Sequence, residues 1–206
     1  MALTIIDLST MKTSQHSILI GCGILKNELR YLAQKHRWLI EMRFLPSSLH
    51  TDLDKLEQSL TRQLRQADES RTLVIYGTCH PLMDVILKPH NAIRVPTQNC
   101  IELLLGKDAF TEALAAGAFF LMEDWARRWA QITTDVFGSK PAPMIEIFHT
   151  AHTHLLALNT PCSSDFTEAA LRIATSIRLP LKWREVSLDR LEHSIAPFIE
   201  SEGDAG

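Results

Sequence analysis

Short apolar runs alternate along this chain with stretches of helical periodicity, and this alternation restricts the possible folds more than any other feature. The clearest apolar runs are residues 17–21 and 72–77, and each ends at a glycine. Between them, the leucines of residues 53–64 recur at the spacing of one helix face. Apolar strands that alternate with helices are typical of a parallel sheet covered on both faces. The sequence therefore predicts an α/β fold: a single-domain, mostly parallel sheet flanked by helices, of the three-layer, doubly wound type.

The chain of 206 residues has the length of one such domain. We expect residues 17–199 to form it, because no long linker rich in proline or glycine interrupts them. Residues 1–16 are expected to form a flexible N-terminal arm, and residues 200–206 a disordered tail. Residues 144–150 are ambiguous between helix and strand. Further strands are predicted at residues 38–45, 92–95, 118–121, 154–158 and 181–186, the last of them at an edge of the sheet.

Composition and charge argue against two classes of protein. The formal net charge is -3, whereas a general nucleic-acid binder usually presents a basic face. No apolar run approaches the ~18 residues of a membrane helix. The short apolar stretch after Met1 has no basic segment before it, so it is not typical of a secretory signal. We therefore expect a cytoplasmic protein that binds neither nucleic acid nor a membrane.

Three of the four cysteines occupy similar positions in this pattern. Cys22, Cys79 and Cys100 each follow a predicted strand and its turn. Because the carboxyl ends of parallel strands meet at one edge of a sheet, these three thiols could converge. Each of them also precedes or opens a helix, whose N-terminus favours the thiolate. Cys162 follows a different kind of turn, and we expect it to be incidental.

Three convergent thiolates suit a site for a soft metal. They could hold zinc, with a fourth ligand from histidine or water, or a four-iron cluster with one open iron. His80, beside Cys79, and His50, on another loop after a strand, are candidates for the fourth ligand. The chain has no CxxC pair, on which strong zinc signatures rest, so Cys22, Cys79 and Cys100 could instead be buried packing residues.

Other polar residues carry weaker signals. His149 and His152 would share a helix face, whereas His152 and His154 would share a strand face, and we favour a satisfied or solvated cluster over a metal site. Glu28 could face the cysteine pocket or be a solvated helix carboxylate. Arg94 ends a buried strand, where a charge is costly unless paired, so it could bind an anionic group or pair with a carboxylate.

With these segments in view, the chain resembles the bacterial and archaeal family known as domain of unknown function 1638. The resemblance covers residues 17–198, and the order and spacing of its short motifs make it specific. The matching segments are Gly21-Cys22-Gly23-Ile24-Leu25 with Glu28, Leu45-Pro46 with Leu49-His50, Tyr76-Gly77-Thr78-Cys79, and Asn99-Cys100-Ile101-Glu102-Leu103-Leu104-Leu105-Gly106, with Trp125 later in the chain.

The resemblance implies that Cys22, Cys79, Cys100 and His50 occupy motif positions of the family. Its members often occur beside corrinoid-dependent methyltransferase systems. This implies a role in methyl transfer or metallocofactor handling, with a small-molecule substrate or a corrinoid methyltransferase protein as partner. The chain departs from the family where Cys79 is followed by His-Pro-Leu rather than Gly-Asn-Gly, and at Asn99, where the family has aspartate.

Three hypotheses follow. The first is a metal-binding protein in which Cys22, Cys79 and Cys100 hold an iron–sulfur cluster or zinc, with His80 or His50 completing or bordering the site. The second is a metal-free accessory or binding module for a corrinoid methyltransferase system. The third is an enzyme with Cys79 as nucleophile and His80 or His50 as base. Adjacent side chains such as Cys79 and His80 often point apart, which weakens that pairing.

Overall fold

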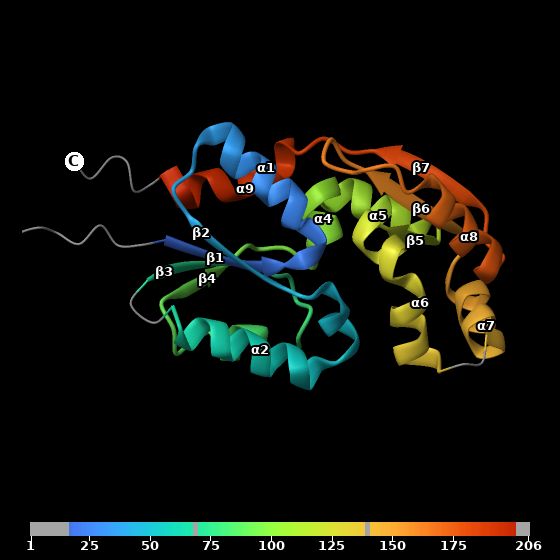
Figure 1. Cartoon of the computed structure of the whole chain (residues 1–206), viewed down its shortest axis with the longest axis horizontal. Helices are drawn as coiled ribbons and strands as arrows, with labels where there is room; N and C mark the ends of the chain where they lie inside the picture. Colours follow the sequence, from blue (N-terminus) through green and yellow to red (C-terminus); the bar gives the residue numbers. More distant parts are fainter. Residues whose placement is uncertain (1–16, 68–69, 139–140, 201–206) are drawn as a thin grey trace, which may run out of the picture.

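The computed structural model describes residues 17–67, 70–138 and 141–200. Its strands form two parallel sheets flanked by helices, and the predicted α/β class with mostly parallel strands is confirmed (Figure 1). The sequence does not indicate that the strands divide between two sheets. The larger sheet has the order β2 (Glu41–Leu45), β1 (Ser17–Cys22), β3 (Arg71–Ile75), β4 (Ala92–Arg94), and the smaller has the order β5 (Ala118–Leu121), β6 (His154–Asn159), β7 (Leu181–Glu185).

The larger sheet is the centre of what we call the first lobe. Its middle strand β1 is buried along its whole length, as its unbroken apolar run predicts. Helices α1 (Lys26–His36) and α9 (Asp189–Glu200) lie on one side of this sheet, and α2 (Leu53–Arg65) lies on the other (Figure 1). The Asp52 side chain caps α2 by accepting a hydrogen bond from the Lys55 amide at 3.1 Å. This lobe is therefore a three-layer sandwich.

The smaller sheet forms the second lobe with α6 (Glu123–Phe137), α7 (Pro141–Ala151) and α8 (Thr167–Ile177), which pack on one another. The ambiguous residues 144–150 lie within α7, and β7 is an edge strand as predicted. Along β6, Leu155 and Ala157 belong to the core beneath these helices. Leu156 and Leu158 belong instead to the core of the first lobe. Since alternate strand residues face opposite sides of a sheet, this sheet separates the two cores.

Helices α4 (Cys100–Leu105) and α5 (Lys107–Ala115) join the lobes, and α9 returns the chain to the first lobe. Polar contacts also cross the junction: the Thr160 hydroxyl donates to Glu28 at 2.8 Å, and the Ser47 hydroxyl donates to Asp124. The core of the first lobe thus includes Leu156 and Leu158 from the sheet of the second lobe.

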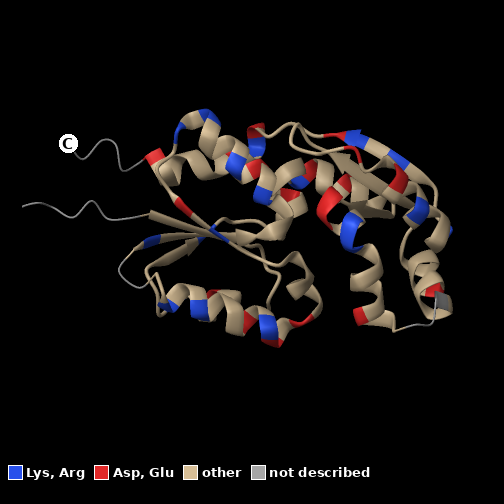
Figure 2. Cartoon of the chain, viewed as in Figure 1, with Lys and Arg blue, Asp and Glu red and all other residues tan. Residues whose placement is uncertain are grey.

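Basic and acidic residues are interspersed over the helices of both lobes (Figure 2). Of the described helices, none is long and apolar enough to cross a membrane. The predicted arm at residues 1–16 lies outside the described residues, as does the predicted tail, except that Glu200 is the last residue of α9.

Candidate functional site

The structure brings Cys22, Cys79, Cys100 and His50 together at the carboxyl edge of the larger sheet. Cys22 ends β1, Cys79 lies in the loop after β3, and Cys100 begins α4 after β4. His50 arrives from a short helix after β2, η3 (Ser47–Thr51). Its Nε2 atom lies 3.3 Å from the Cys22 sulfur, and its ring also lies within hydrogen-bonding reach of Cys79. The four side chains therefore come from the ends of four neighbouring parallel strands.

Cys22 is the thiolate of this cluster. A hydrogen bond from the Cys100 thiol stabilises the anion most, and His50 stabilises it further, so that the pKa of Cys22 falls to about 5 although burial opposes the charge. The same hydrogen bond and burial raise the pKa of Cys100. Cys100 therefore keeps its proton, and Cys22 carries the negative charge at neutral pH.

His50 is the matching cation. Burial opposes its charge, but its hydrogen bonds to Cys22 and Cys79 raise the pKa of His50 to about 10. Its Nε2–H donates to the Cys22 sulfur. The floor of the site is therefore a buried thiolate–imidazolium pair, with two further thiols in contact with it.

Tyr76 also belongs to this cluster, although the sequence analysis assigned it no role. It follows β3, is 1% exposed, and its ring lies 6.0 Å from that of His50. Burial and the nearby Cys22, Cys100 and Cys79 raise the pKa of Tyr76. Its hydroxyl lies close to Cys22, yet it has no hydrogen bond of ordinary geometry among the described residues. A buried hydroxyl without such a hydrogen bond is uncommon in folded proteins.

Two local features deliver Cys79 and Cys100 to the same place. Gly77 lets the two loops touch, because a Cβ atom there would lie 2.0 Å from the Gln98 carbonyl oxygen. Across this contact, the Thr78 amide donates to the Gln98 carbonyl at 2.8 Å. The Asn99 side chain then caps α4 by accepting from the amides of the two residues after Cys100. Asn99 thus performs the capping that an aspartate could also perform.

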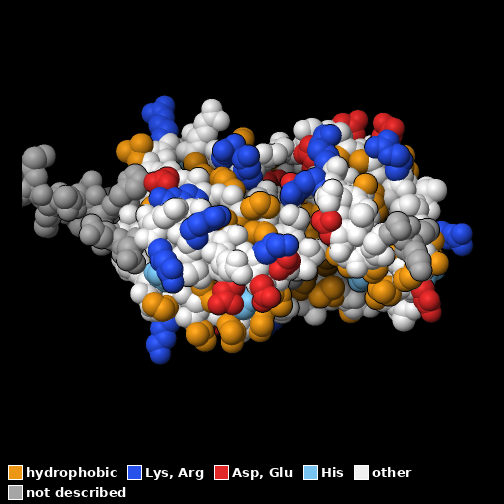
Figure 3. Space-filling view, turned by 60° about the horizontal axis from the view of Figure 1, so that its bottom comes forward, with side chains coloured by type: hydrophobic (Ala, Val, Ile, Leu, Met, Phe, Trp, Pro, Cys, Tyr) orange, Lys and Arg blue, Asp and Glu red, His pale blue; other side chains and the backbone are white. Residues whose placement is uncertain are grey.

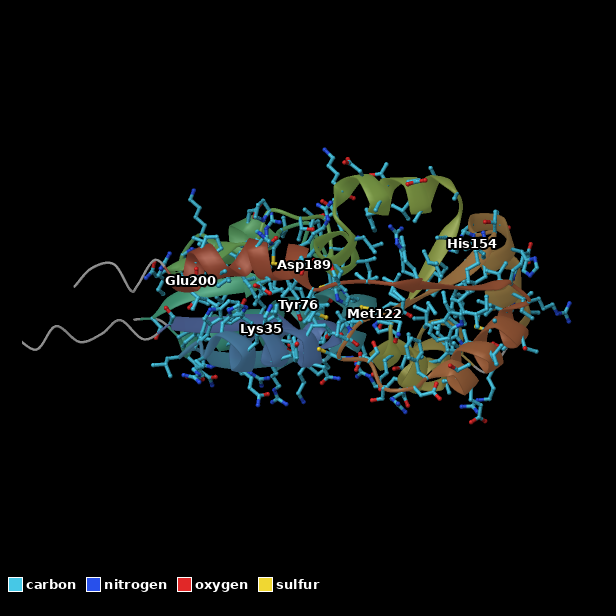
Figure 4. The ribbon with its side chains drawn as sticks, turned by 90° about the horizontal axis from the view of Figure 1, so that it is seen from above. Lys35, Tyr76, Met122, His154, Asp189 and Glu200 are labelled. Atoms are coloured by element: carbon cyan, nitrogen blue, oxygen red, sulfur yellow. The ribbon has the colours of Figure 1, made fainter. Side chains whose placement is uncertain are left out.

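A cleft of about 530 Å³ lies above the cluster, at the junction of the two lobes. His50, Cys79 and Cys100 line it from the first lobe, and Met122 and Trp125 line it from the second. Figure 4 shows Tyr76 and Met122 at this junction, and Figure 3 shows hydrophobic side chains in the hollow between the lobes. Trp125, which the sequence connects only with the family resemblance, thus lies in the wall of this cleft.

His80 does not join the cluster, so its predicted role as a ligand or base has no support in its contacts. Its Nδ1 accepts a hydrogen bond from the Leu82 amide at 3.1 Å, and its Nε2 lies 3.6 Å from Glu57 on α2. His80 is adjacent to Cys79 in sequence, but the turn after Cys79 directs the imidazole toward α2 instead of the thiols.

His149, His152 and His154 each contact a different protein partner, as expected for histidines that do not form a metal site. His149 donates to the Ile177 carbonyl at 3.0 Å, and His154 hydrogen-bonds its neighbour Thr153 at 2.9 Å. His152 lines the cleft and packs against Phe119, with 5.2 Å between the ring centroids.

The two charged candidates also find protein partners. Arg94 pairs with Asp84 through two hydrogen bonds of 3.0 and 3.3 Å, which is the second of the alternatives that the sequence left open. Glu28 is buried and accepts from Thr160 across the junction of the lobes. The fourth cysteine, Cys162, is half-buried, and burial raises its pKa to about 11.

Replacing Glu28 with glutamine is expected to stabilise the protein more at high pH than at low pH. Burial raises the pKa of Glu28 above its ordinary value of 4.5, so the folded state of the wild type loses stability as the pH rises from 4.5 through that raised pKa. A glutamine amide oxygen can still accept from Thr160 but does not ionise. The variant should gain about 1.4 kcal/mol over the wild type for each unit of the shift.

This prediction can be checked by urea unfolding at about pH 4 and about pH 8. Glu112→Gln on the exposed face of α5 is the control, and its effect should not change with pH. A Glu28→Gln effect that is equal at both pH values would contradict the burial argument.

The sulfur and imidazole nitrogen atoms of the cluster are suitable ligands for a soft metal. In this structure they contact one another directly. The described residues that line the cleft include no Asp or Glu, and thiolates and imidazole prefer zinc or iron–sulfur clusters to magnesium or calcium. Within residues 17–67, 70–138 and 141–200, no three His, Cys, Asp or Glu side chains are already arranged as ligands. The thiols and His50 would therefore have to separate to admit an ion, and the unpartnered Tyr76 hydroxyl lies beside them.

Comparison with known proteins gives one match. A family model described as a protein of unknown function (DUF1638) matches residues 44–195. No curated protein and no solved structure matches the chain. The matched range includes His50, Cys79 and Cys100, and it begins after Cys22.

Proposed function

The chain belongs to the DUF1638 family, whose description names no activity, and from the chemistry of the site we propose that it is a metal-binding protein. Cys22, Cys79 and Cys100 would hold an iron–sulfur cluster or a zinc ion, and His50 would complete or border the site. Such a centre would act in methyl transfer or in the handling of a metallocofactor.

One observation carries this proposal: three thiols and an imidazole, each from the end of a different strand, meet at the base of a cleft. A packing role alone would not need Cys22 as a thiolate, because a buried charge is costly unless it has a function or a partner. Here the partner is His50, with its Nε2 at 3.3 Å. Deprotonated thiols are the form that binds metals.

Each side chain has a distinct part in such a site. Cys22 already holds the negative charge, while Cys100 must lose its proton before it can bind a metal. His50 is protonated and hydrogen-bonds Cys22 and Cys79. It can bind a metal only after it loses a proton. Cys79 and Cys100 face the cleft, so they would present the centre to a substrate. A bound zinc ion would supply Lewis-acid activation of a substrate thiol, and an iron–sulfur cluster would supply electron transfer or cofactor maturation.

The direct test is anaerobic purification, an absorption spectrum, and assays of iron, zinc and sulfide per chain. Brown protein with about four irons and matching sulfide would support a cluster. Colourless protein with about one zinc would support a Lewis-acid site. Protein that stays metal-free after reconstitution with each metal would refute the proposal and favour the accessory module or the thiol enzyme.

A metal-free thiol enzyme is the second candidate, because His50 reaches both Cys22 and Cys79. Cys79 is half-buried and lines the cleft, so it would be the nucleophile that a substrate meets, with His50 as its proton partner. In metal-free protein, iodoacetamide should then alkylate Cys79 first. Replacing His50 with glutamine should slow that reaction about tenfold or more, because it removes the positive charge that lies beside the attacking sulfur.

Peptide mapping by mass spectrometry would measure the alkylation rate at each cysteine. His149→Gln is the matched control, since His149 is exposed on α7 and bonds only the Ile177 carbonyl among the described residues. Equal rates in the wild type and in His50→Gln would remove His50 from any catalytic role at Cys79.

A further inference from the structure

The walls of the cleft are mostly apolar, and the polar residues in its lining are His50, Thr78, Gln98, Asn99 and His152. On the first-lobe side, Ile24 and Ile101 flank Cys79 and Cys100. The remaining wall is aromatic and aliphatic, and it comes from α5, β5 and the start of α6: Phe110, Leu114, Ala118, Phe119, Phe120, Met122 and Trp125. The volume of about 530 Å³ lies in the range of small-molecule sites, which is ~300–1,000 Å³.

The aromatic wall is held in place from behind. The Phe119 ring packs edge-on against Phe148, with the centroids 4.8 Å apart, and against Trp129, with the centroids 5.9 Å apart. Phe110 stacks on Phe120 with 5.4 Å between the centroids. Rings that are buried on their far side cannot turn away easily, so the shape of this wall is set before a ligand arrives.

The lining of the cleft offers little to attract an anion. Among the described lining residues there is no Asp, Glu, Lys or Arg. His152, on the far wall, has its pKa lowered by burial, so it is neutral at neutral pH. The Nε2 atom of His50 lies 3.3 Å from the Cys22 sulfur, so this atom already has a partner. An anionic ligand would therefore lose its hydration and find no lysine or arginine in return.

We propose that this cleft binds an uncharged small molecule with an apolar body, and that it does not bind nucleotides, phosphate esters or carboxylates. Such a molecule would be the substrate of the proposed metal site. Its role as a substrate rests on the metal proposal, whereas its binding to the cleft does not. The apolar body would lie against the wall of α5 and β5, and its reacting end would face Cys79 and Cys100. The hydrogen-bonding groups at the rim are few, chiefly Gln98, Thr78 and His152.

Titration calorimetry with naphthol and naphthoate tests this inference, because the two probes share one ring system and differ in charge. Naphthol should bind with one molecule per chain, and naphthoate should bind at least about tenfold more weakly. Equal or tighter binding of naphthoate, or no binding of naphthol, would overturn the inference. This comparison uses the wild-type protein and needs no variant to fold.

A matched pair of variants locates the binding. Leu114, on α5 in the cleft wall, is 45% exposed, and Leu171, on α8 outside the cleft, is 53% exposed. Leu114→Glu should weaken naphthol binding about tenfold or more, and Leu171→Glu should leave it unchanged. Equal affinities in the two variants would place the probe elsewhere. If the wild type is a dimer and Leu114→Glu is a monomer, then a second copy of the chain occupies the cleft. That result would overturn the inference.

Parallel assays of metal content and of naphthol binding on the wild-type protein separate this inference from the metal proposal. Naphthol binding by a protein that takes up no metal would refute the metal proposal alone. Metal uptake without naphthol binding would refute the present inference alone.

Discussion

Purified Cys79→Ser protein is expected to retain almost no metal. Loss of an outer partner of a metal ligand typically costs ~10–100-fold in affinity, so loss of a ligand should cost more than about 100-fold. Serine is close in size to cysteine, and Cys79 is half-buried at the cleft, so the fold should tolerate the change. Iron, zinc and sulfide assays on the anaerobically purified variant measure the effect directly.

Cys162→Ser provides the matched control for this experiment. Cys162 is also half-buried and packs against the same core, but it lies in the loop after β6 and is not among the residues that line the cleft. It should therefore retain the full metal content of the wild type. Full metal content in Cys79→Ser as well would sink the three-thiol site, whereas loss in both variants would indicate damage to the fold.

Gly77→Ala is expected to destabilise the protein and to disrupt the site at the same time. An added Cβ atom would lie 2.0 Å from the Gln98 carbonyl oxygen and 2.4 Å from the Asn99 nitrogen. Both are backbone atoms, so no side chain can rotate away to make room. The loop that carries the α4 cap and Cys100 would have to move, and we expect the free energy of unfolding to fall by about 3 kcal/mol or more.

Urea unfolding of both proteins measures this loss, with Gly21→Ala as the control in the adjacent strand. A Cβ atom at Gly21 would lie 3.4 Å from Ile75 and Leu19, which is ordinary contact, so the control should lose about 1 kcal/mol or less. In Gly77→Ala, Cys100 should be displaced from the site, so this variant should also lose its metal. Unfolding of the two variants at the same urea concentration would show that the two loops do not touch as described.

Elements with strong local patterns could be predicted almost to the residue. The strand expected at residues 17–21 is found at Ser17–Cys22, and the helix expected from the leucines of residues 53–64 is found at Leu53–Arg65. The apolar face of that helix is buried as its periodicity predicts. Boundaries were less accurate where the pattern was weak, as in β2, which begins at Glu41 instead of residue 38.

The candidate site could be predicted in part for the same reason. In parallel strands the residues that follow each carboxyl end share one edge, so the positions of Cys22, Cys79 and Cys100 in the pattern were enough to suggest that they converge. The choice between His50 and His80 was not available from spacing. His80 is next to Cys79 but contacts Glu57, whereas His50 is 28 residues from Cys22 and contacts it.

Sequence pattern thus determined the α/β class, the order of the elements and the edge on which the thiols lie, because each depends on burial and periodicity within a short segment. Only the tertiary structure decided that the strands divide into two sheets, that Tyr76 lies among the thiols, and that a mostly apolar cleft lies above them. These features arise from contacts such as Glu28 with Thr160, whose partners are 132 positions apart. A local pattern records whether a side chain is buried, but the neighbours that bury it are set by the packing of the whole chain.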